Sequence, residues 1–255
     1  MRFTDKALLI TGGTAGIGLR TAERALAEGA RAVVVTGRDA GRGAEAVRRL
    51  GDRAHYLPQD VTDEHRWEEV LKEAEAVGGP LDVLVNNAGH AGTEERQDPE
   101  HMSLAEWRRL TASNLDSVFL GCRAAIRAMR GRGGAIVNLS STAGLAGTPA
   151  FAAYGAAKAA VAHLTRSVAL YCARSGYPIR CNSVHPALVG TDLRDRILDH
   201  FHPDRETALA GYLARVPLGT LGTTDDVAAA VLYLASDDAA YVTGTQLVVG
   251  GGLGS

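Results

Sequence analysis

Residues 7–18 read ALLITGGTAGIG, and the interpretation of the whole chain starts from them. The apolar run at 7–10 is typical of a buried strand. After the glycines, the apolar positions Ile17, Ala22, Ala25 and Leu26 repeat at helical spacing, and Gly29 is a natural residue to end a helix. A strand, a glycine turn and a helix in this order predict the first unit of an α/β sheet.

The three spaced glycines of this turn have different expected tasks. Gly12 permits a tight turn. Gly16 lets the backbone approach a pyrophosphate at the positive end of the helix, and Gly18 allows the helix to pack closely on the strand. The spacing is G-x-x-x-G-x-G instead of the G-x-G-x-x-G of most dinucleotide folds. Taken alone, the glycine turn is compatible with a nucleotide site and with a purely structural loop.

The end of the next strand, expected at 32–35, predicts how an adenosine ribose would be bound. An acid at this point binds the ribose 2′-hydroxyl and rejects a 2′-phosphate. Here Gly37 replaces the acid, and Arg38 offers a guanidinium suited to a phosphate. This favours NADP(H), while NAD(H) stays possible because Asp39 could pair with Arg38 or bind the ribose itself. The alternative for Arg38 is an ordinary solvated charge in a turn.

Further strands are expected at 54–57, 83–85, 135–139, 179–184 and 246–249. The first of these is followed by Asp60 and Val61, which would meet the adenine edge. The second runs into the sequence Asn86, Asn87, Ala88, Gly89. Amides and small residues at the carboxyl end of a strand suit a ligand in the crevice of an open parallel sheet, although an Asx turn would explain the two asparagines equally well.

Helices are expected where cap residues precede apolar periodicity. Thr62 or Asp63 would begin a helix to 77, and Ser103 with Glu106 forms a capping box for a long helix to about 129. A helix from 153 to about 175 and a last one at 225–234 complete the pattern. Residues 90–102 predict a polar surface loop without a metal site.

The stretch 141–158, STAGLAGTPAFAAYGAAK, carries the residues for proton transfer. Tyr154 and Lys158 are four apart and would share one face of a helix. A free tyrosine titrates near ~10, so we expect the Lys158 ammonium, together with a cationic cofactor ring, to lower the pKa of Tyr154. A lone Y-x-x-x-K is common by chance, but here Ser141 precedes it and the glycine turn accompanies it.

Composition excludes several classes of partner. The chain has 255 residues, 46% of them apolar, which is enough for one large core. A net charge of −2 argues against nucleic acid or an anionic membrane surface. We find no apolar run near the ~20 residues of a membrane span and no signal peptide, so we expect a cytoplasmic protein with a small-molecule partner. Cys122, Cys172 and Cys181 lack metal-ligand spacing and are expected to be small buried residues.

The chain resembles the short-chain dehydrogenase/reductase family. The resemblance rests on the T-G-x-x-x-G-x-G turn, the N-N-A-G strand end and the S-x12-Y-x-x-x-K site, and it spans residues 6–252. It implies one α/β domain over 1–255: a Rossmann-like, doubly wound parallel sheet of about seven strands with helices on both faces. It also implies reversible hydride transfer between NAD(P) and a carbonyl or secondary alcohol, and a homotetramer built through the helices that hold Asn114 and Tyr154.

The resemblance assigns roles to individual residues. Ser141 would orient the substrate oxygen, Tyr154 would be the proton donor or acceptor, and Lys158 would assist Tyr154 and bind the nicotinamide ribose. Asn114 would bend its helix and hold a water in a proton relay, with a satisfied core amide as the alternative. The positions assigned to the cofactor are Gly12, Thr14, Gly16, Ile17, Gly18, Gly37, Arg38, Asp60, Val61, Asn87, Ala88, Gly89, Tyr154, Lys158, Pro186, Val189 and Thr191.

The substrate is expected to be apolar. Residues 188–220 would form the substrate-binding loop region, and Leu145, Ala146, Phe151 and Leu188 would line an apolar pocket. These features favour an NADP(H)-dependent oxidoreductase for a secondary alcohol or an apolar, hydroxysteroid-like ketone. A 3-oxoacyl-carrier-protein reductase is the alternative, because Arg127, Arg130 and Arg132 could meet an acidic carrier. A non-catalytic cofactor-binding protein would not need the full set of Ser141, Tyr154 and Lys158.

Overall fold

The apolar runs become the strands of one parallel sheet in a computed structural model, which describes residues 1–92, 96–191, 194, 197–198 and 204–253. Within these residues the spatial order is β3-β2-β1-β4-β5-β6-β7, with every neighbouring pair parallel. The strands are β1 (Ala7–Thr11), β2 (Ala32–Gly37), β3 (Ala54–Pro58), β4 (Val83–Asn86), β5 (Gly134–Leu139), β6 (Ile179–Pro186) and β7 (Gln246–Val249).

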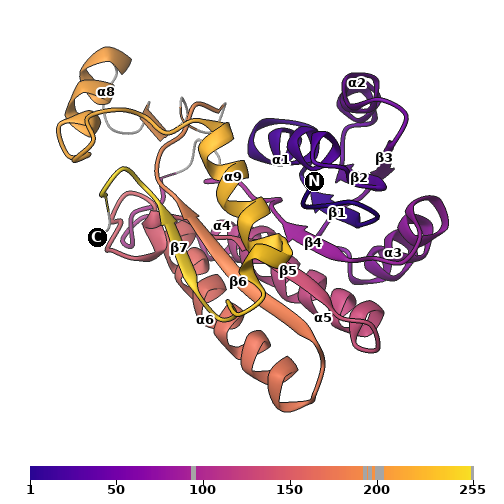
Figure 1. Ribbon diagram of the computed structural model, residues 1–255. Helices are drawn as coiled ribbons and strands as arrows, with labels where there is room; N and C mark the ends of the chain where they lie inside the picture. Colours follow the sequence, from indigo (N-terminus) through magenta and orange to yellow (C-terminus); the bar gives the residue numbers. More distant parts are fainter. Residues whose placement is uncertain (93–95, 192–193, 195–196, 199–203, 254–255) are drawn as a thin grey trace.

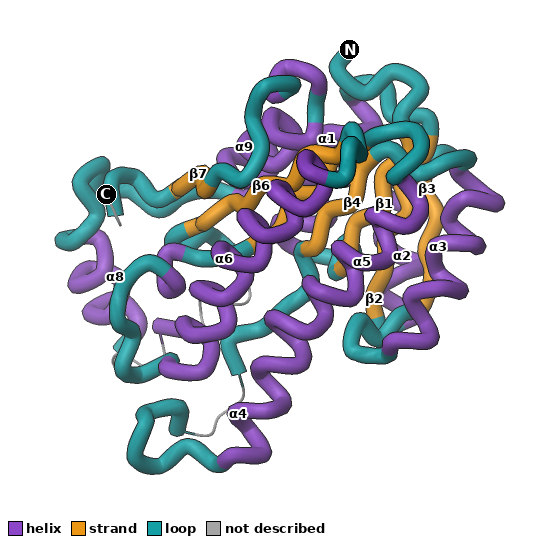
Figure 2. The backbone as a smooth tube through the Cα atoms, turned by 90° about the horizontal axis from the view of Figure 1, so that it is seen from below, coloured by secondary structure: helices purple, strands orange, loops and turns teal. Residues whose placement is uncertain are grey.

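Helices cover both faces of the sheet (Figures 1 and 2). On one face α1, α2 and α9 enclose a core, and on the other α3, α5 and α6 enclose a second core. The seven-stranded doubly wound sheet predicted from the sequence is therefore confirmed. The helices are α1 (Gly16–Ala27), α2 (Ala40–Leu50), α3 (Glu64–Gly78), α4 (Leu104–Thr111), α5 (Ser117–Met129), α6 (Ala152–Arg174), α8 (Arg205–Leu213) and α9 (Thr224–Ala235), with the short turns η1 (Ala112–Asp116), η2 (Thr142–Gly144) and η3 (Asp237–Ala239).

The strand order reverses at β1, which pairs with β2 on one side and with β4 on the other. In an open parallel sheet the ligand crevice lies outside the carboxyl ends of the strands at such a switch point. The glycine turn after β1 and the N-N-A-G sequence after β4 both lie at this edge. The topology therefore brings together motifs that are far apart in the chain.

The helix ends show which predicted caps are used. Asp63 caps α3 by accepting from the backbone N–H groups of His65 and Arg66, and Ser103 caps α4 by accepting from Glu106 N. The long helix predicted to 129 is not uniformly α-helical, because the π-helical segment η1 separates α4 from α5. The sequence analysis did not assign α2, which Asp39 caps through Arg42 N.

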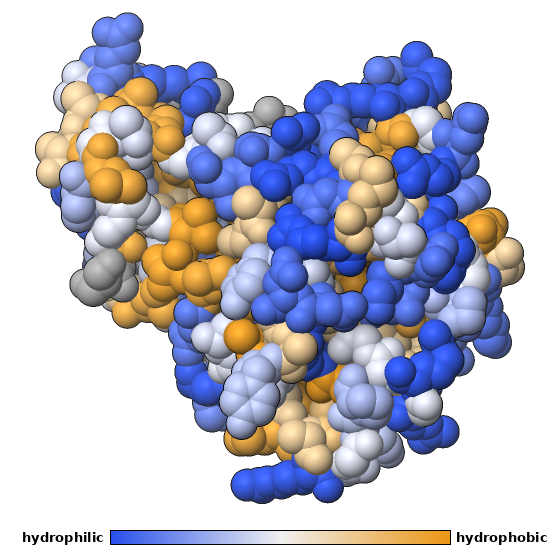
Figure 3. Space-filling view, in the orientation of Figure 1, coloured by the Kyte–Doolittle hydropathy of each residue, from blue (hydrophilic) through white to orange (hydrophobic). Residues whose placement is uncertain are grey.

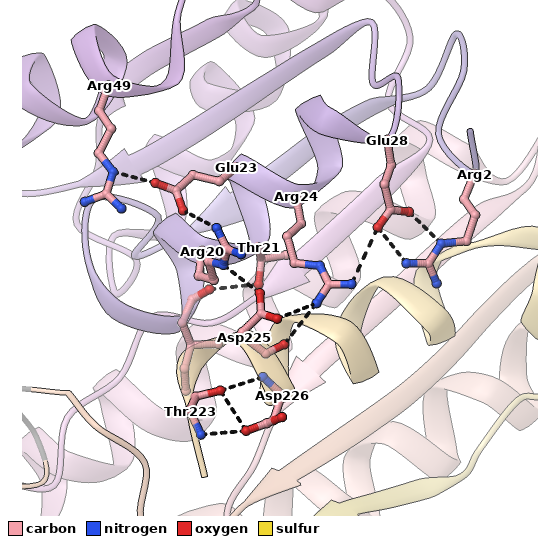
Figure 4. A network of polar contacts seen from close by, with 11 residues as sticks. Arg2, Arg20, Thr21, Glu23, Arg24, Glu28, Arg49, Thr223, Asp225 and Asp226 are labelled. Carbon is pink, nitrogen blue, oxygen red and sulfur yellow. Dashed lines mark hydrogen bonds and ion pairs between the residues drawn. The ribbon is translucent and has the colours of Figure 1, made fainter.

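A polar network ties α1 to α9 (Figure 4). The carboxylate of Asp225 accepts from Arg20 Nε at 2.7 Å and from Arg24 Nη1 at 3.1 Å. The hydrogen bond from Arg20 is the main cause that holds the pKa of Asp225 below its usual value. Thr223 and Asp226 form the capping box of α9. Because α9 follows the 188–220 region directly, this network anchors the end of that region to α1.

Every described helix is too short or too polar to cross a membrane.

Candidate active site

The predicted proton-transfer residues meet at the carboxyl end of β5. Ser141 follows β5 and caps the turn η2, where its hydroxyl oxygen accepts from Ala143 N at 3.1 Å. Tyr154 and Lys158 lie in the first turns of α6, and both are buried. The Ser141 side chain acts on the pKa of the Tyr154 phenol, so the two groups lie near each other. The buried Tyr154 and Lys158 and the half-buried Ser141 thus form one cluster.

In the chain without a cofactor, the pKa of Tyr154 is raised, so Lys158 alone does not give the lowering expected from Lys158 together with a cationic cofactor ring. Burial raises the pKa of Tyr154, and the hydrogen bond with Ser141 opposes this only in part. Lys158 Nζ lies 5.6 Å from the centroid of the tyrosine ring and donates to Leu139 O at 2.9 Å. The same burial lowers the pKa of Lys158 to about 8. The apolar surroundings penalise both charged forms, so the neutral phenol dominates at neutral pH.

Asn114 lies in η1, the π-helical segment, as a helix-bending residue would. Its amide Nδ2 donates to His90 O at 2.9 Å and to Leu110 O at 3.0 Å, and its Oδ1 accepts from His90 N at 3.2 Å. The amide is therefore satisfied by backbone groups, the alternative that the sequence left open. It also borders the cluster, because a Cβ placed at Gly89 would lie 2.6 Å from Asn114 Oδ1 and 3.4 Å from Lys158 Nζ.

The glycines after β1 have the local geometry that the sequence predicts. Gly12 has φ +63° and Gly16, the first residue of α1, has φ +52°, both in the left-handed region. A Cβ at Gly18 would come within 2.6 Å of Gly12 O and of Asn87 Nδ2. The amino end of α1 therefore presses against the strand ends. Because these glycines have no side chains, the backbone N–H groups at the amino end of α1 can approach a phosphate.

The end of β2 meets the glycine turn. A Cβ at Gly37 would lie 3.3 Å from the Thr14 side chain, so these two elements are in contact. Arg38 is exposed and has no ion-pair or hydrogen-bond partner in the described part of the chain. Asp39 does not pair with Arg38, since its carboxylate caps α2. This removes one of the two cautions about Arg38.

The residues that follow β3 and β4 have different surroundings: some line the crevice and others lie in the core. Asp60 accepts from Thr62 N at 2.9 Å and from its hydroxyl at 2.7 Å, and Val61 O accepts from Trp67 Nε1. Asn87 lines the crevice and donates to Thr11 O at 2.9 Å. Backbone N–H groups of Asn87 and Ala88 both donate to the Thr11 hydroxyl at 3.0 Å. These contacts join β4 to the turn after β1.

Asn86 differs from its neighbour, because it turns into the core. It donates to Asn138 Oδ1 at 2.9 Å, and Asn138 in turn donates to Thr165 at 2.9 Å. The buried thiols of Cys122 and Cys181 lie 3.6 Å from Asn138 side-chain atoms. The three cysteines are free and buried, as predicted. Asn86 thus has a structural role, and its strand-end position alone could not reveal this.

The segment after β6 borders both the glycine turn and Ser141. A Cβ at Gly16 would lie 3.4 Å from Thr191 Cγ2, which places this loop beside the start of α1. The Pro186 carbonyl accepts from the Ser141 hydroxyl at 3.4 Å. His185 is fully buried, with Nδ1 3.3 Å from Ser141 O and Nε2 2.9 Å from Ser183 Oγ. Burial lowers the pKa of His185, so its ring is neutral at neutral pH.

A cavity of about 580 Å³ lies between these elements and α8. Figure 3 shows apolar surface gathered where the α8 region faces the rest of the molecule. The predicted residues that line the cavity are Ile17, Asn87, Gly89, Ser141, Ala146, Phe151, Tyr154, Lys158, Pro186, Leu188, Val189 and Thr191.

Leu145 follows η2, is 37% exposed and is not among the described residues that line the cavity. The sequence analysis missed Tyr212, Arg215 and Leu253, which do line it. Only the general assignment of 188–220 to the substrate pointed to the first two. Within that region, residues 192–193, 195–196 and 199–203 lie outside the described residues.

The loop at 90–102 brings three potential metal ligands together on the surface. Ligand atoms of Asp98, Glu100 and His101 lie within 4.8 Å of one another. Asp98 is already bonded to His101 Nδ1 at 2.7 Å and to Arg96 Nε at 2.9 Å. We assign no metal to this cluster. Residues 93–95 of the same loop lie outside the described residues.

Comparison with known proteins identifies the class to which this fold and site belong. Residues 12–254 match the family model described as Enoyl-(Acyl carrier protein) reductase. The chain belongs to the short-chain dehydrogenase/reductase family, as its motifs predict, and it is an oxidoreductase acting on CH–OH groups.

Individual relatives cover nearly the whole chain. It is 38% identical over 255 residues to the NADP-dependent (R)-specific alcohol dehydrogenase of Lentilactobacillus kefiri, with 98% of this chain and 97% of that protein covered. It is also 38% identical over 252 residues to the 3-alpha-(or 20-beta)-hydroxysteroid dehydrogenase of Mycobacterium tuberculosis, covering 98% and 90%. The crystal structure of levodione reductase matches with a TM-score of 0.93 at 31% identity, covering 99% of both chains.

Proposed function

We propose that the protein interconverts secondary alcohols and apolar ketones with NADP(H), with Tyr154 as the acid–base group. One observation carries this proposal: Ser141, Tyr154 and Lys158 meet at one end of an apolar cavity, directly beside the glycine turn of a switch point. The sequences of relatives that act on alcohols and hydroxysteroids support the same substrate class.

In the direction of reduction, the Tyr154 hydroxyl donates its proton to the substrate carbonyl oxygen. The raised pKa of this residue keeps the phenol protonated until that step. The Ser141 hydroxyl hydrogen-bonds to the same oxygen and stabilises the charge that develops there. Lys158, held by Leu139 O, supplies a cation beside the phenolate that forms. In the direction of oxidation Tyr154 accepts the proton from the alcohol.

The residues present fit a dinucleotide. Gly12, Gly16 and Gly18 leave the backbone at the start of α1 bare, and Thr191 lies beside Gly16, where it would border a pyrophosphate. Asp60 and Val61 would border the adenine, while Ile17, Asn87, Ala88, Gly89, Pro186 and Val189 would border the ribose and nicotinamide. Lys158 would also bind the nicotinamide ribose. When bound, the cofactor supplies or accepts the hydride.

NADP(H) is the proposed cofactor because of the end of β2. Arg38 is exposed beside Gly37 and Thr14 and forms no salt bridge in the described residues, although its charge helps the Thr62 hydrogen bonds to lower the pKa of Asp60, so its guanidinium is available for a 2′-phosphate. Gly37 occupies the position at which an acidic side chain would repel this phosphate. The relative from Lentilactobacillus kefiri is NADP-dependent by name.

Asn114 is proposed to complete the site by holding a water between its amide and Lys158. Its Oδ1 and the Lys158 Nζ both border Gly89, where the missing side chain leaves room. The region 188–220 is proposed to bind the substrate within the single domain 1–255. The homotetramer and the cytoplasmic location stay predictions.

A cofactor-oxidation assay tests this function. NADPH is mixed with the enzyme and a panel of cyclic ketones, steroid ketones and 3-oxoacyl thioesters. We expect turnover of the cyclic or steroid ketones. Turnover of the 3-oxoacyl thioesters alone would favour the alternative, and binding of NADPH without turnover of any member would favour the non-catalytic alternative.

The structure gives the carrier-protein alternative little support from the arginines that suggested it. Arg127 and Arg130 lie at the end of α5, and Arg132 follows them. At 1.5 Å per residue, α5 places them roughly 20 Å along its axis from Asn114. Arg127 approaches Glu68 at 3.6 Å, and Arg132 donates to Leu81 O at 3.0 Å. A carrier docked there would face the amino edge of the sheet.

A further inference from the structure

The cavity has a second polar end, formed by α8 and the residues after it. Tyr212 lies in the last turn of α8, Arg215 follows three positions later, and both line the cavity. The Leu188 backbone N–H donates to the Tyr212 hydroxyl oxygen at 2.9 Å, which leaves the hydroxyl hydrogen free to donate in turn. Burial raises the pKa of Tyr212, and the charge of Arg215 opposes this rise, so the guanidinium lies near the phenol.

Arg215 is exposed and lines the cavity. In the described part of the chain no carboxylate lies within ion-pair distance of it. Arg24, by contrast, is bonded to Asp225 at 3.1 Å, while Arg38 is another arginine without an ion pair in the described residues. A planar guanidinium without a partner, beside a hydroxyl that can donate, is suited to a carboxylate.

An apolar layer separates this end from the reacting end. Ile197 packs against the cluster of Ala91, Phe151 and Tyr154 and also against the cluster of Leu188, Leu198 and Ala208, on which Tyr212 packs as well. A substrate that reaches from the Tyr154 hydroxyl to Arg215 must therefore pass between apolar walls. Besides the polar groups of the reacting site, the cavity lining includes Arg194, Tyr212 and Arg215 among many apolar or small residues.

We propose that the preferred substrate is a ketone or secondary alcohol with an apolar body and a carboxylate on the side opposite to the reacting carbon, bound by Arg215 and Tyr212. This inference rests on the proposed function and specifies its substrate. A purely apolar ketone would still fit the walls, but it would leave the guanidinium without a partner. The anion adds binding at a distance from the chemistry, so the effect belongs mainly in KM.

The test compares three ketones that differ only at the distal group: 4-oxocyclohexanecarboxylate, its methyl ester and 4-methylcyclohexanone. With NADPH saturating, we expect kcat/KM for the carboxylate to exceed that for the ester about tenfold, which equals ~1.4 kcal/mol. Because Arg215 is exposed, the advantage should shrink as salt is added. Equal kcat/KM for carboxylate and ester would overturn the proposal.

Two variants assign the effect. Arg215→Met keeps the aliphatic stem and should bring the ratio of kcat/KM for the carboxylate to kcat/KM for the ester close to one. Tyr212→Phe should lower the same advantage to a smaller extent. Arg174→Met makes the same change of charge at the far end of α6, roughly 30 Å along the helix from Tyr154, and should change nothing. A loss for all three ketones in Arg215→Met would instead indicate a structural role and contradict the proposal.

A binding measurement separates this inference from the proposed function. Cyclohexanecarboxylate has no carbonyl to reduce, so its binding does not depend on turnover. In the presence of NADPH it should raise the Tm of the wild type and of Arg174→Met, but not of Arg215→Met. A Tm shift that is the same in all three proteins would overturn the anion site, whether or not any ketone is reduced.

Discussion

Arg38 and Gly37 decide the proposed choice of cofactor. A charge-assisted bond to a 2′-phosphate is worth about 1.5–3 kcal/mol, or about ten- to a hundredfold in Kd. Because Arg38 is exposed, we expect the lower part of that range.

We predict that the wild type binds NADPH more tightly than NADH, that Arg38→Ala loses most of this preference, and that Gly37→Asp reverses it. The introduced Asp fits with a small shift, since a Cβ at Gly37 lies 3.3 Å from Thr14. Titration of both cofactors measures the four Kd ratios, with Arg48→Ala as the control because Arg48 pairs with Glu45 elsewhere on α2. Equal Kd values for the two cofactors in the wild type would show that Arg38 is only a solvated turn residue.

Lys158 gives a pH-dependent prediction about stability. Burial lowers its pKa in the folded chain to about 8, below the 10.5 of an exposed lysine. Below pH 8 both states carry the proton, and the folded state bears the full cost of a buried charge. Between about 8 and 10.5 the folded state releases the proton first, so stability rises with pH by up to ~1.4 kcal/mol per unit.

The comparison is with Lys158→Met, which lacks the titrating group. Urea unfolding at pH 7.5 and 9.5 should show the wild type gaining free energy of unfolding relative to this variant at the higher pH. Other groups titrate alike in both proteins and cancel. Parallel pH curves for the two proteins would mean that Lys158 is not desolvated as the structure shows.

At the scale of residues, the sequence predicted positions better than protonation states. Tyr154 and Lys158 were placed together from their spacing alone, and they do meet beside Ser141. In the chain without a cofactor the pKa of Tyr154 is raised, because burial outweighs the effect of its polar neighbours. Burial depth is a tertiary property that local spacing does not contain.

At the scale of secondary-structure elements, Gly89 lies where the segment after β4 meets η1 and α6. A methyl group at this glycine would press on Asn114 Oδ1 and Lys158 Nζ. We predict that Gly89→Ala lowers kcat about ten- to a hundredfold, because small displacements of reacting groups have large kinetic effects. The free energy of unfolding should fall by only about 1–3 kcal/mol, as for other overpacked sites.

The matched control is Gly131→Ala, since a Cβ at Gly131 meets no atom within 4 Å. Steady-state kinetics and urea unfolding of both variants measure the two effects separately. If Gly89→Ala keeps the wild-type kcat, then the space between Asn114 and Lys158 has no part in catalysis.

Strands and helices with a strong apolar pattern could be predicted from the sequence. Helix α2, which buries few residues, and η1, whose form depends on a side-chain hydrogen bond, could not. All seven strands follow from apolar runs, and α3 follows from its Asp63 cap. Helix α2 was missed because its sequence AGRGAEAVRRL buries only Gly43 and Ala46. The π-helical η1 arises where Asn114 Nδ2 takes the Leu110 carbonyl, which its own backbone N–H would otherwise use.

For the whole molecule, the fold follows from the sequence but half of the cavity does not. The edge of the sheet at β1 and β4 could be predicted because parallel strands align their carboxyl ends. The opposite wall comes from α8 and from Leu253 near the end of the chain, and these meet the site only in the folded chain. Neither has a sequence pattern that marks a substrate contact.

The central claim is that Tyr154 transfers the proton in an NADP(H)-dependent reduction, and Tyr154→Phe tests it most directly. The variant removes the hydroxyl but keeps the ring, which packs with Ala91 and Phe151. Its NADPH Kd should match that of the wild type, while kcat for a cyclic ketone should fall about 10²–10⁴-fold, the usual contribution of general acid catalysis. A variant that retains more than about a tenth of the wild-type kcat, with NADPH bound equally well, would contradict the account.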